Sequence, residues 1–238
     1  MSVKTIITAG CSFSTVEDDR QGYQGRTWPF HLHNITGIPS IYGGRLSVGN
    51  GFISRSAIYN CSKALEVYEP HEILLGIMWS GRSRFEYFVE NSTDSYATEI
   101  IPNNKNYNIT NPGWDDPMSV RLNRVLNSEV GQVVSTIEHI LRVQNYCKVY
   151  NIKYFMSQFY KDACLPNNEI LQHVEVEYLY KQIDFDQFLP VSNMWDWCLS
   201  SGLSWDSHHF ETLHPTLEQQ EAFAKSVIYP FLKNKNYL

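Results

Sequence analysis

The chain is short of charged residues, and no part of it is strongly basic. Charged side chains make up 18% of the 238 residues, and 19 Lys and Arg stand against 25 Asp and Glu, which gives a net charge of −6. Proteins that bind nucleic acids neutralise phosphates with clustered Lys and Arg. The composition therefore argues against a nucleic acid as a partner.

Long apolar runs and paired cysteines are also missing. No stretch reaches the ~20 apolar residues of a membrane-spanning helix, and the N-terminal segment contains Lys4 and reaches polar Ser12 too soon for a secretory signal. The 5 cysteines are scattered and odd in number, which argues against a disulfide framework. We expect a protein that does not contact membranes and is cytoplasmic at synthesis, which is compatible with a phage origin.

Apolar runs alternate with helical patterns along the chain, as they do in proteins with a parallel sheet. Four runs predict buried strands, at residues 3–9, 38–42, 72–79 and 152–157. The run at 72–79 is almost continuously apolar, which is typical of a central strand covered on both faces. The sequence predicts an α/β protein with a three-layer α/β/α sandwich, built on a mainly parallel sheet of about five strands.

Helical spacing and capping residues mark the helices between these strands. Pro29 suits the first turn of a short helix, and the apolar positions from 54 to 69 predict a helix after a glycine-rich loop. A longer pattern over residues 120–147 predicts a helical region with a break near Gly131. Thr216 is followed three residues later by Gln, a capping box that predicts the start of the last helix.

Two polar segments that carry aromatic residues interrupt this alternation, at about residues 85–117 and 158–204. Irregular insertions of this length in a compact domain serve as lids, binding loops or contact surfaces. Because the other elements follow one pattern, we expect a single domain over residues 1–238 that carries both insertions. Their aromatic side chains suit contact with a substrate, with a protein partner or with a second copy of the chain.

Ser12 follows the first predicted strand and the turn residue Gly10, at the sheet edge where α/β proteins carry out chemistry. A serine hydroxyl becomes a nucleophile when a base removes its proton, and His214 is the candidate base. Glu211 can orient the imidazole and stabilise its protonated form, and Asp206 is the alternative carboxylate. Taken singly, Ser12 also suits a helix N-cap, and His214 suits the start of a helix.

These residues resemble the short blocks of the SGNH (GDSL-type) hydrolases. Gly10-Cys11-Ser12 matches the family's first block, Gly49 its second-block glycine, and Glu211-Thr212-Leu213-His214-Pro215 its last block. The resemblance implies a flavodoxin-like fold and a serine esterase with an acyl-serine intermediate, without a metal or organic cofactor. It also implies catalytic roles for Ser12, His214 and Glu211, and an oxyanion hole that includes the backbone N–H groups of Ser12 and Gly49.

The third block of that family, Gly-x-Asn-Asp, has no full counterpart. Residues 76–80 lie at the equivalent strand end and read Gly-Ile-Met-Trp-Ser, without the Asn that donates to the oxyanion. The loss of one such donor typically costs ~10²–10³ in turnover. Asn50 and Ser80 are the candidate substitutes. The rival hypothesis is a non-catalytic binding or structural module with the same fold and a degraded oxyanion hole.

Three residues near the expected site, Trp79, Ser80 and Arg82, are candidate substrate contacts. Arg82 and Arg84 both suit contact with an anionic or sugar substrate, and both can instead pair with Glu86 or Glu90 on the surface. For the substrate we expect an acyl ester, with acetyl as the acyl group and a carbohydrate as its carrier. The polar, aromatic-bearing insertions suit a sugar better than a long-chain lipid.

Two other chemistries are alternatives to the serine hydrolase. Cys11 should point away from Ser12 and pack as a small buried residue, which makes it the weaker nucleophile candidate. A metal site is the second alternative, because ligand-type side chains are dense near the C-terminus: Asp206, His208, His209, Glu211 and His214. The cluster lacks the spacing of a helical His-x-x-x-His motif, so no metal is expected.

Overall fold

A four-stranded parallel sheet with the order β2-β1-β3-β6 forms the centre of the structure. Its strands are β1 (Thr5–Gly10), β2 (Ser40–Tyr42), β3 (Ile73–Trp79) and β6 (Lys153–Gln158). The computed structural model describes residues 2–16, 26–90, 99–100, 107–110, 117–126, 128–161, 168–203 and 214–238. Every residue of β1 and β3 is buried, as expected for central strands covered on both faces.

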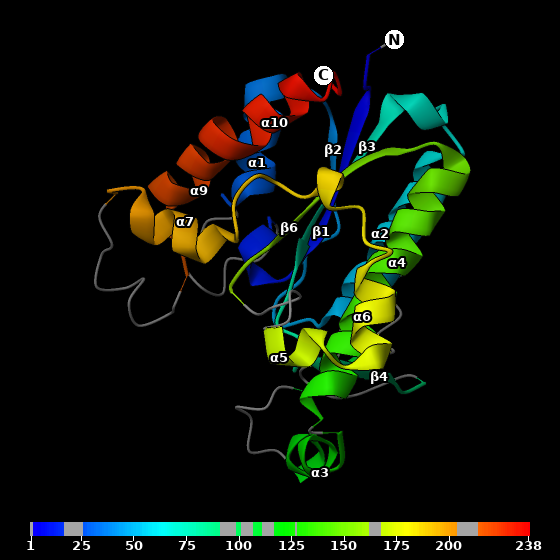
Figure 1. The fold of residues 1–238 in the computed structure, drawn as a ribbon. Coiled ribbons are helices and arrows are strands. Elements are labelled where there is room, and N and C mark those ends of the chain that lie inside the picture. The colour runs from blue at the N-terminus through cyan, green and yellow to red at the C-terminus, as the bar shows by residue number, and fades with distance from the viewer. Residues whose placement is uncertain are drawn as a thin grey trace.

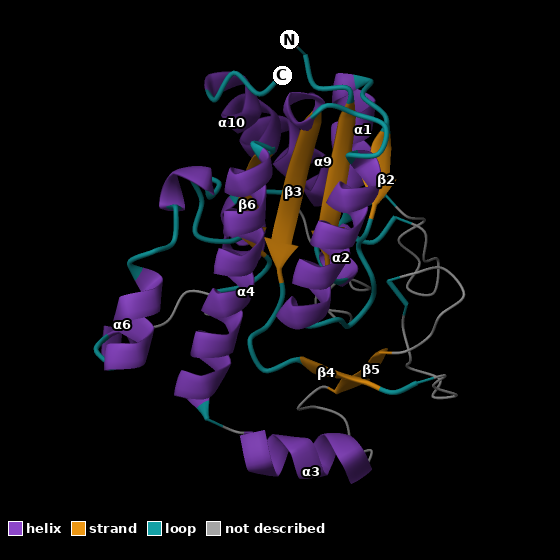
Figure 2. Ribbon diagram, turned by 90° about the vertical axis from the view of Figure 1, so that its right-hand side faces the viewer, coloured by secondary structure: helices purple, strands orange, loops and turns teal. Residues whose placement is uncertain are grey.

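Helices cover both faces of the sheet, so the predicted three-layer α/β fold is confirmed (Figures 1 and 2). One layer contains α1 (Trp28–Thr36), α9 (Leu217–Phe223), η4 (Ala224–Ile228) and α10 (Tyr229–Asn234). The other contains α2 (Asn50–Ala64) and α4 (Glu129–Tyr150). Short 3-10 turns, η1 (Ser12–Ser14) and η2 (Pro70–Glu72), flank β1 and β3. None of the helices among the described residues has the length and apolar character needed to cross a bilayer.

Capping chemistry explains where several helices begin. Pro29 lies in the first turn of α1, and the predicted capping box of α9 is present, with Thr216 and Gln219 bonded in both directions. The break predicted near Gly131 lies earlier, because the Ser128 side chain accepts the Gly131 N–H at 3.1 Å and starts α4 there. A separate helix, α3 (Pro117–Leu126), precedes this break.

Other elements differ from the sequence prediction. The sheet has four strands among the described residues, where about five were predicted. The insertion expected to lack a pattern contains an antiparallel hairpin, β4 (Phe85–Phe88) with β5 (Tyr107–Thr110), whose partners are too far apart in sequence to show as a hairpin signal. The helix predicted over residues 54–69 spans Asn50–Ala64, and its start was missed because Asn50 and Gly51 favour turns over helices.

The second insertion is mostly short helices. They are α5 (Asn168–Leu171), α6 (Val174–Tyr180), η3 (Phe185–Gln187) and α7 (Met194–Ser200). Val176 and Met194 are fully buried, so the segment adds to the core.

Gly76 in β3 lies under two aromatic rings, and a Cβ there would come within 2.5 Å of Phe155 Cζ and 3.2 Å of Trp28 Cη2. We therefore predict that Gly76→Ala lowers the free energy of unfolding by about 1–3 kcal/mol, the usual cost of overpacking a filled core. Urea unfolding measures this change. In a Phe155→Leu background the same substitution should cost less, because the clashing ring atoms are gone. Strictly additive costs would contradict the steric explanation.

Candidate active site

The ends of β1 and β3 bring two serines to the same edge of the sheet. Gly10 and Met78 are the last paired residues of these neighbouring parallel strands, and Ser12 and Ser80 each follow two residues later. Neighbouring strands lie roughly 5 Å apart, so the chain leaves the sheet at both points side by side. This edge is where ligands bind in open α/β sheets.

Ser12 and His214 are in hydrogen-bond contact at this edge, although 202 positions separate them in the chain. His214 Nε2 lies 2.8 Å from Ser12 Oγ. Ser12 begins the turn η1, whose N-cap is Cys11, so Ser12 is not itself the N-cap. The His214 ring also packs on Phe13, with 4.9 Å between ring centroids. The geometry allows the imidazole to take the serine proton.

The predicted carboxylates Glu211 and Asp206 lie outside the described residues, as do His208 and His209. The structure therefore leaves the acidic partner of His214 and the C-terminal metal alternative as predictions. Within the ranges that the structure describes, no group of three or more His, Cys, Asp or Glu side chains is placed to hold a metal ion. Cys11 is fully buried, as predicted for a small core residue.

Gly49, the N-cap of α2, packs directly against the segment that follows β3. A Cβ at Gly49 would lie 2.3 Å from the backbone oxygen of Arg84 and 2.7 Å from Glu86 Oε2, so this position has no room for a side chain. The Gly49 backbone also interacts with the Glu86 carboxyl. The backbone that the resemblance assigns to the oxyanion hole therefore faces a carboxylate in this structure.

Asn50 binds the backbone of Ser80 from both sides. Its Oδ1 accepts the Ser80 N–H at 2.7 Å, and its Nδ2 donates to the Ser80 carbonyl at 3.1 Å and to Thr136 Oγ1 at 3.2 Å. An amide nitrogen carries two protons, and both are used here. The oxyanion role predicted for Asn50 therefore cannot come from its side chain in this conformation.

The predicted substrate contacts fall into two groups. Trp79 and Ser80 are both fully buried, so neither presents surface to a substrate. Arg82 is partly exposed. It forms an ion pair with Glu129 at 3.7 Å, rather than with Glu86 or Glu90.

Arg84, for which the sequence left open a contact with an anionic or sugar substrate and a surface ion pair, lies next to this site. Its Nη1 donates to Ser80 Oγ at 3.0 Å, and its guanidinium lies 5.5 Å above the Phe159 ring. Phe159 follows β6, and its ring is 4.9 Å from that of Phe13, which in turn contacts His214. A row of rings thus connects Arg84 to the Ser12–His214 pair.

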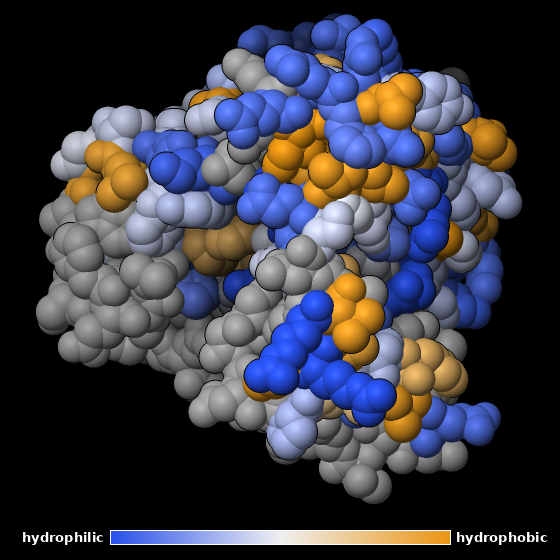
Figure 3. All heavy atoms as spheres, turned by 60° about the horizontal axis from the view of Figure 1, so that its bottom comes forward, coloured by the Kyte–Doolittle hydropathy of each residue, from blue (hydrophilic) through white to orange (hydrophobic). Residues whose placement is uncertain are grey.

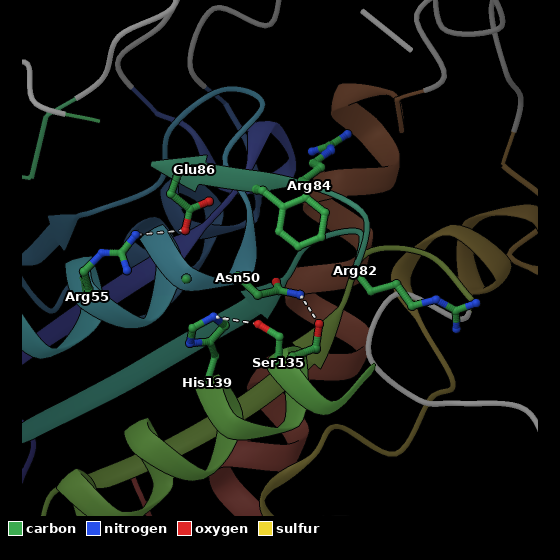
Figure 4. Close-up of a pocket in the computed structure, with 10 residues that line it drawn as sticks. Asn50, Arg55, Arg82, Arg84, Glu86, Ser135 and His139 are labelled. Atoms are coloured by element: carbon green, nitrogen blue, oxygen red, sulfur yellow. Dashed lines mark hydrogen bonds and ion pairs between the residues drawn. The ribbon is translucent and has the colours of Figure 1, made fainter. Parts of the chain in front are cut away.

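A polar pocket of about 140 Å³ lies beside Asn50, between α2, α4 and the start of β4 (Figure 4). It is lined by Asn50, Gly51, Arg55, Arg82, Arg84, Phe85, Glu86, Ser135, Thr136 and His139. Arg55 and Glu86 form an ion pair at 3.0 Å in its wall. Burial raises the pKa of Glu86, while Arg55 and the backbone of Phe52 and Gly49 act in the opposite direction.

His139 forms another wall of the pocket and has weak contacts with two hydroxyls, Ser135 at 3.4 Å and Ser54 at 3.5 Å. Burial lowers the pKa of His139 to about 4, with Arg142 and Arg55 adding to the effect, so the ring is neutral at pH 7. Sequence reasoning missed His139, because a histidine within the helical pattern carries no signal of what surrounds it.

We predict that His139 makes the fold less stable in acid. In the unfolded chain His139 binds a proton near pKa 6.5, and in the folded chain only near 4. The free energy of unfolding is therefore highest above pH 6.5 and decreases as the pH falls toward 4. Between about pH 7.5 and about pH 5 the loss is roughly 2 kcal/mol. His139→Gln should reduce the pH dependence of urea unfolding by that amount. Glu138→Gln, an exposed neighbour, is the control; equal pH dependence in the wild type and His139→Gln would contradict the prediction.

Comparisons with known proteins show which solved structures have a similar fold. No family model and no curated protein sequence matches the chain. Among solved structures, the esterase EstA from Pseudoalteromonas sp., inhibited by monoethylphosphonate, is 14% identical with a TM-score of 0.51, over 99% of this chain and 100% of its own. A protein assigned to the G-D-S-L family of lipolytic proteins, from Desulfitobacterium hafniense, is 10% identical with a TM-score of 0.49, over 93% and 96%. The chain thus shares the fold of the esterase EstA.

Proposed function

We propose that the chain is a serine ester hydrolase with Ser12 as nucleophile and His214 as general base. The observation that carries the proposal is the 2.8 Å contact between Ser12 Oγ and His214 Nε2 at the carboxyl edge of the sheet. The esterase description of EstA, one of the structural neighbours, supports it.

The reaction proceeds in two acyl-transfer steps. His214 Nε2 takes the proton from Ser12 Oγ, and Oγ adds to the ester carbonyl to form a tetrahedral oxyanion. The oxyanion collapses to an acyl-serine as the imidazolium gives its proton to the leaving alcohol. Water then attacks the acyl-serine, with His214 again as base, and free Ser12 and the acid are released. We assign Glu211, with Asp206 as alternative, to orient the His214 ring and stabilise its charge.

The backbone N–H of Ser12 and the start of α2 at Gly49 are our candidates for the oxyanion hole. A helix start carries partial positive charge, which favours an anion. Glu86 faces the same helix start, and the Asn50 amide is bound to Ser80. This oxyanion hole is therefore weaker than one with a third-block Asn, and we expect a slow esterase.

For the substrate we propose a short acyl group, acetyl, on a carbohydrate. Ser12 is only 8% exposed, which favours a small acyl group. Phe159, Tyr160 and Trp195 lie in a row of ring contacts that leads away from the site and suits a sugar face. On the face shown in Figure 3, the described residues form hydrophobic patches with hydrophilic residues around them. The hydrophilic part of this face suits a polar substrate.

Substitution of the proposed nucleophile and base tests the function. Ser12→Ala and His214→Ala should each reduce the turnover of p-nitrophenyl acetate by about 10⁴-fold or more, because each removes a member of one catalytic unit. A fluorophosphonate should label Ser12 in the wild type and leave the Ser12→Ala chain unlabelled, as mass spectrometry can show. Ser62→Ala, on the exposed side of α2, is the matched control. A wild type that neither turns over the ester nor reacts with the probe favours the non-catalytic module.

The acidic partner can be identified by paired substitutions. Glu211→Gln should lower kcat by about 10⁴-fold, the cost of a wrongly oriented imidazole, with a much smaller effect on KM. Asp206→Asn should have a small effect. The pH dependence of kcat should shift only in the variant that removes the true partner. The reverse ranking of the two variants would assign Asp206 instead.

A further inference from the structure

Arg84 is a fixed cation at the mouth of the site. Among the described residues no carboxylate lies within ion-pair distance of its guanidinium, which contacts Ser80 Oγ and the Phe159 ring. The nearby Arg55 and Arg82 have carboxylate partners, Glu86 and Glu129. In Figure 4 the Arg84 side chain extends away from Glu86 and Arg55. In a chain with a net charge of −6, this leaves a positive group next to the catalytic pair.

The Arg84 side chain is held in place by the residues that it contacts. Ser80, on which the guanidinium rests, is fully buried, and its backbone is held on both sides by Asn50. The Phe159 ring supports the guanidinium from the β6 side. A long side chain that is held in this way loses less conformational entropy when it binds a ligand. This arrangement is typical of a recognition residue.

A continuous row of ring contacts joins Arg84 to the Ser12–His214 pair. Going from His214 to Arg84, the steps are 4.9 Å to Phe13, 4.9 Å to Phe159 and 5.5 Å to the guanidinium. Ser80, the anchor of Arg84, leaves the sheet beside Ser12. Arg84 and Ser12 therefore lie at the same edge of the sheet, where two groups of one substrate can meet them.

We infer that Arg84 binds an anionic group on the alcohol part of the substrate, so that the preferred ester carries a carboxylate near the acyl group. Guanidinium N–H groups pair with a carboxylate through two parallel hydrogen bonds, which fixes orientation as well as charge. An acylated sugar acid has this combination of ester, ring and carboxylate. The inference rests on the proposed function and narrows its substrate class from any carbohydrate ester to an anionic one.

Two acetate esters, one with a free carboxylate and one with that carboxyl group methylated, test the inference. Para-acetoxybenzoate carries a carboxylate on its alcohol part, and its methyl ester at that carboxyl is neutral. For each protein, the ratio of kcat/KM for the charged over the neutral ester is measured. The two esters also have different leaving groups. This difference affects the wild type and the variant equally, so it cancels when their ratios are compared. Arg84→Met should lower the ratio by about tenfold to a hundredfold, the effect of one charged hydrogen bond, through a higher KM for the charged ester.

Further variants separate charge from geometry. Arg84→Lys keeps the charge but loses the planar pair of donors, so it should recover part of the ratio. Lys233→Met removes the same charge from α10, at the opposite end of the molecule, and should leave the ratio as it is in the wild type (Figure 1). Higher ionic strength should raise the KM of the charged ester in the wild type more than in Arg84→Met.

Other results would overturn the inference. An equal loss of kcat for both esters would mean that Arg84 acts on the transition-state oxyanion, and an unchanged ratio would mean that it only supports Phe159. If the wild type hydrolyses neither ester, the proposed function fails, and binding decides the inference. In the Ser12→Ala chain, an NMR titration should show para-acetoxybenzoate binding more tightly than the neutral ester, and Arg84→Met should abolish the difference.

Discussion

The amide of Asn50 joins the start of α2 to the residue that follows β3, and the rest of the site depends on this contact. It satisfies both the N–H and the carbonyl of buried Ser80. Either group left unpaired would cost about 1–3 kcal/mol. With Ser80 held in this way, the chain beyond it runs close to Gly49, where a side chain would have no room. The loop is thereby fixed relative to the helix.

The same contact decides how charge is arranged around the Ser12–His214 pair. Because the Asn50 amide is occupied by the Ser80 backbone, it cannot serve the oxyanion, and the helix start that remains faces Glu86. Ser80 in turn offers its hydroxyl oxygen to Arg84. Arg55 and Arg82 are paired with carboxylates, whereas the Arg84 guanidinium next to the site has no carboxylate partner among the described residues. We propose a slow esterase because Glu86 faces the helix start, and a preference for an anionic ester because Arg84 lies beside the site.

The general architecture and the central pair were predictable because they rest on local signals. Buried runs with helical patterns between them predict the parallel sheet, and a strand followed by Gly10 and a serine places Ser12 at its edge. His214 was predicted from the block that precedes the last helix. Their 2.8 Å contact follows once both segments adopt the fold, because one lies at the end of β1 and the other just before α9.

What the sequence by itself determined was therefore the α/β order of elements, the capping box at Thr216 and the residue types that meet at the edge of the sheet. Only the tertiary structure decided how the polar side chains are paired. In the folded chain Asn50 binds Ser80, Glu129 pairs with Arg82, and Glu86 pairs with Arg55. Arg84 has no carboxylate partner among the described residues. The reason is physical: a buried polar group takes whichever partner the folded chain brings within about 3 Å, and that partner is distant in sequence.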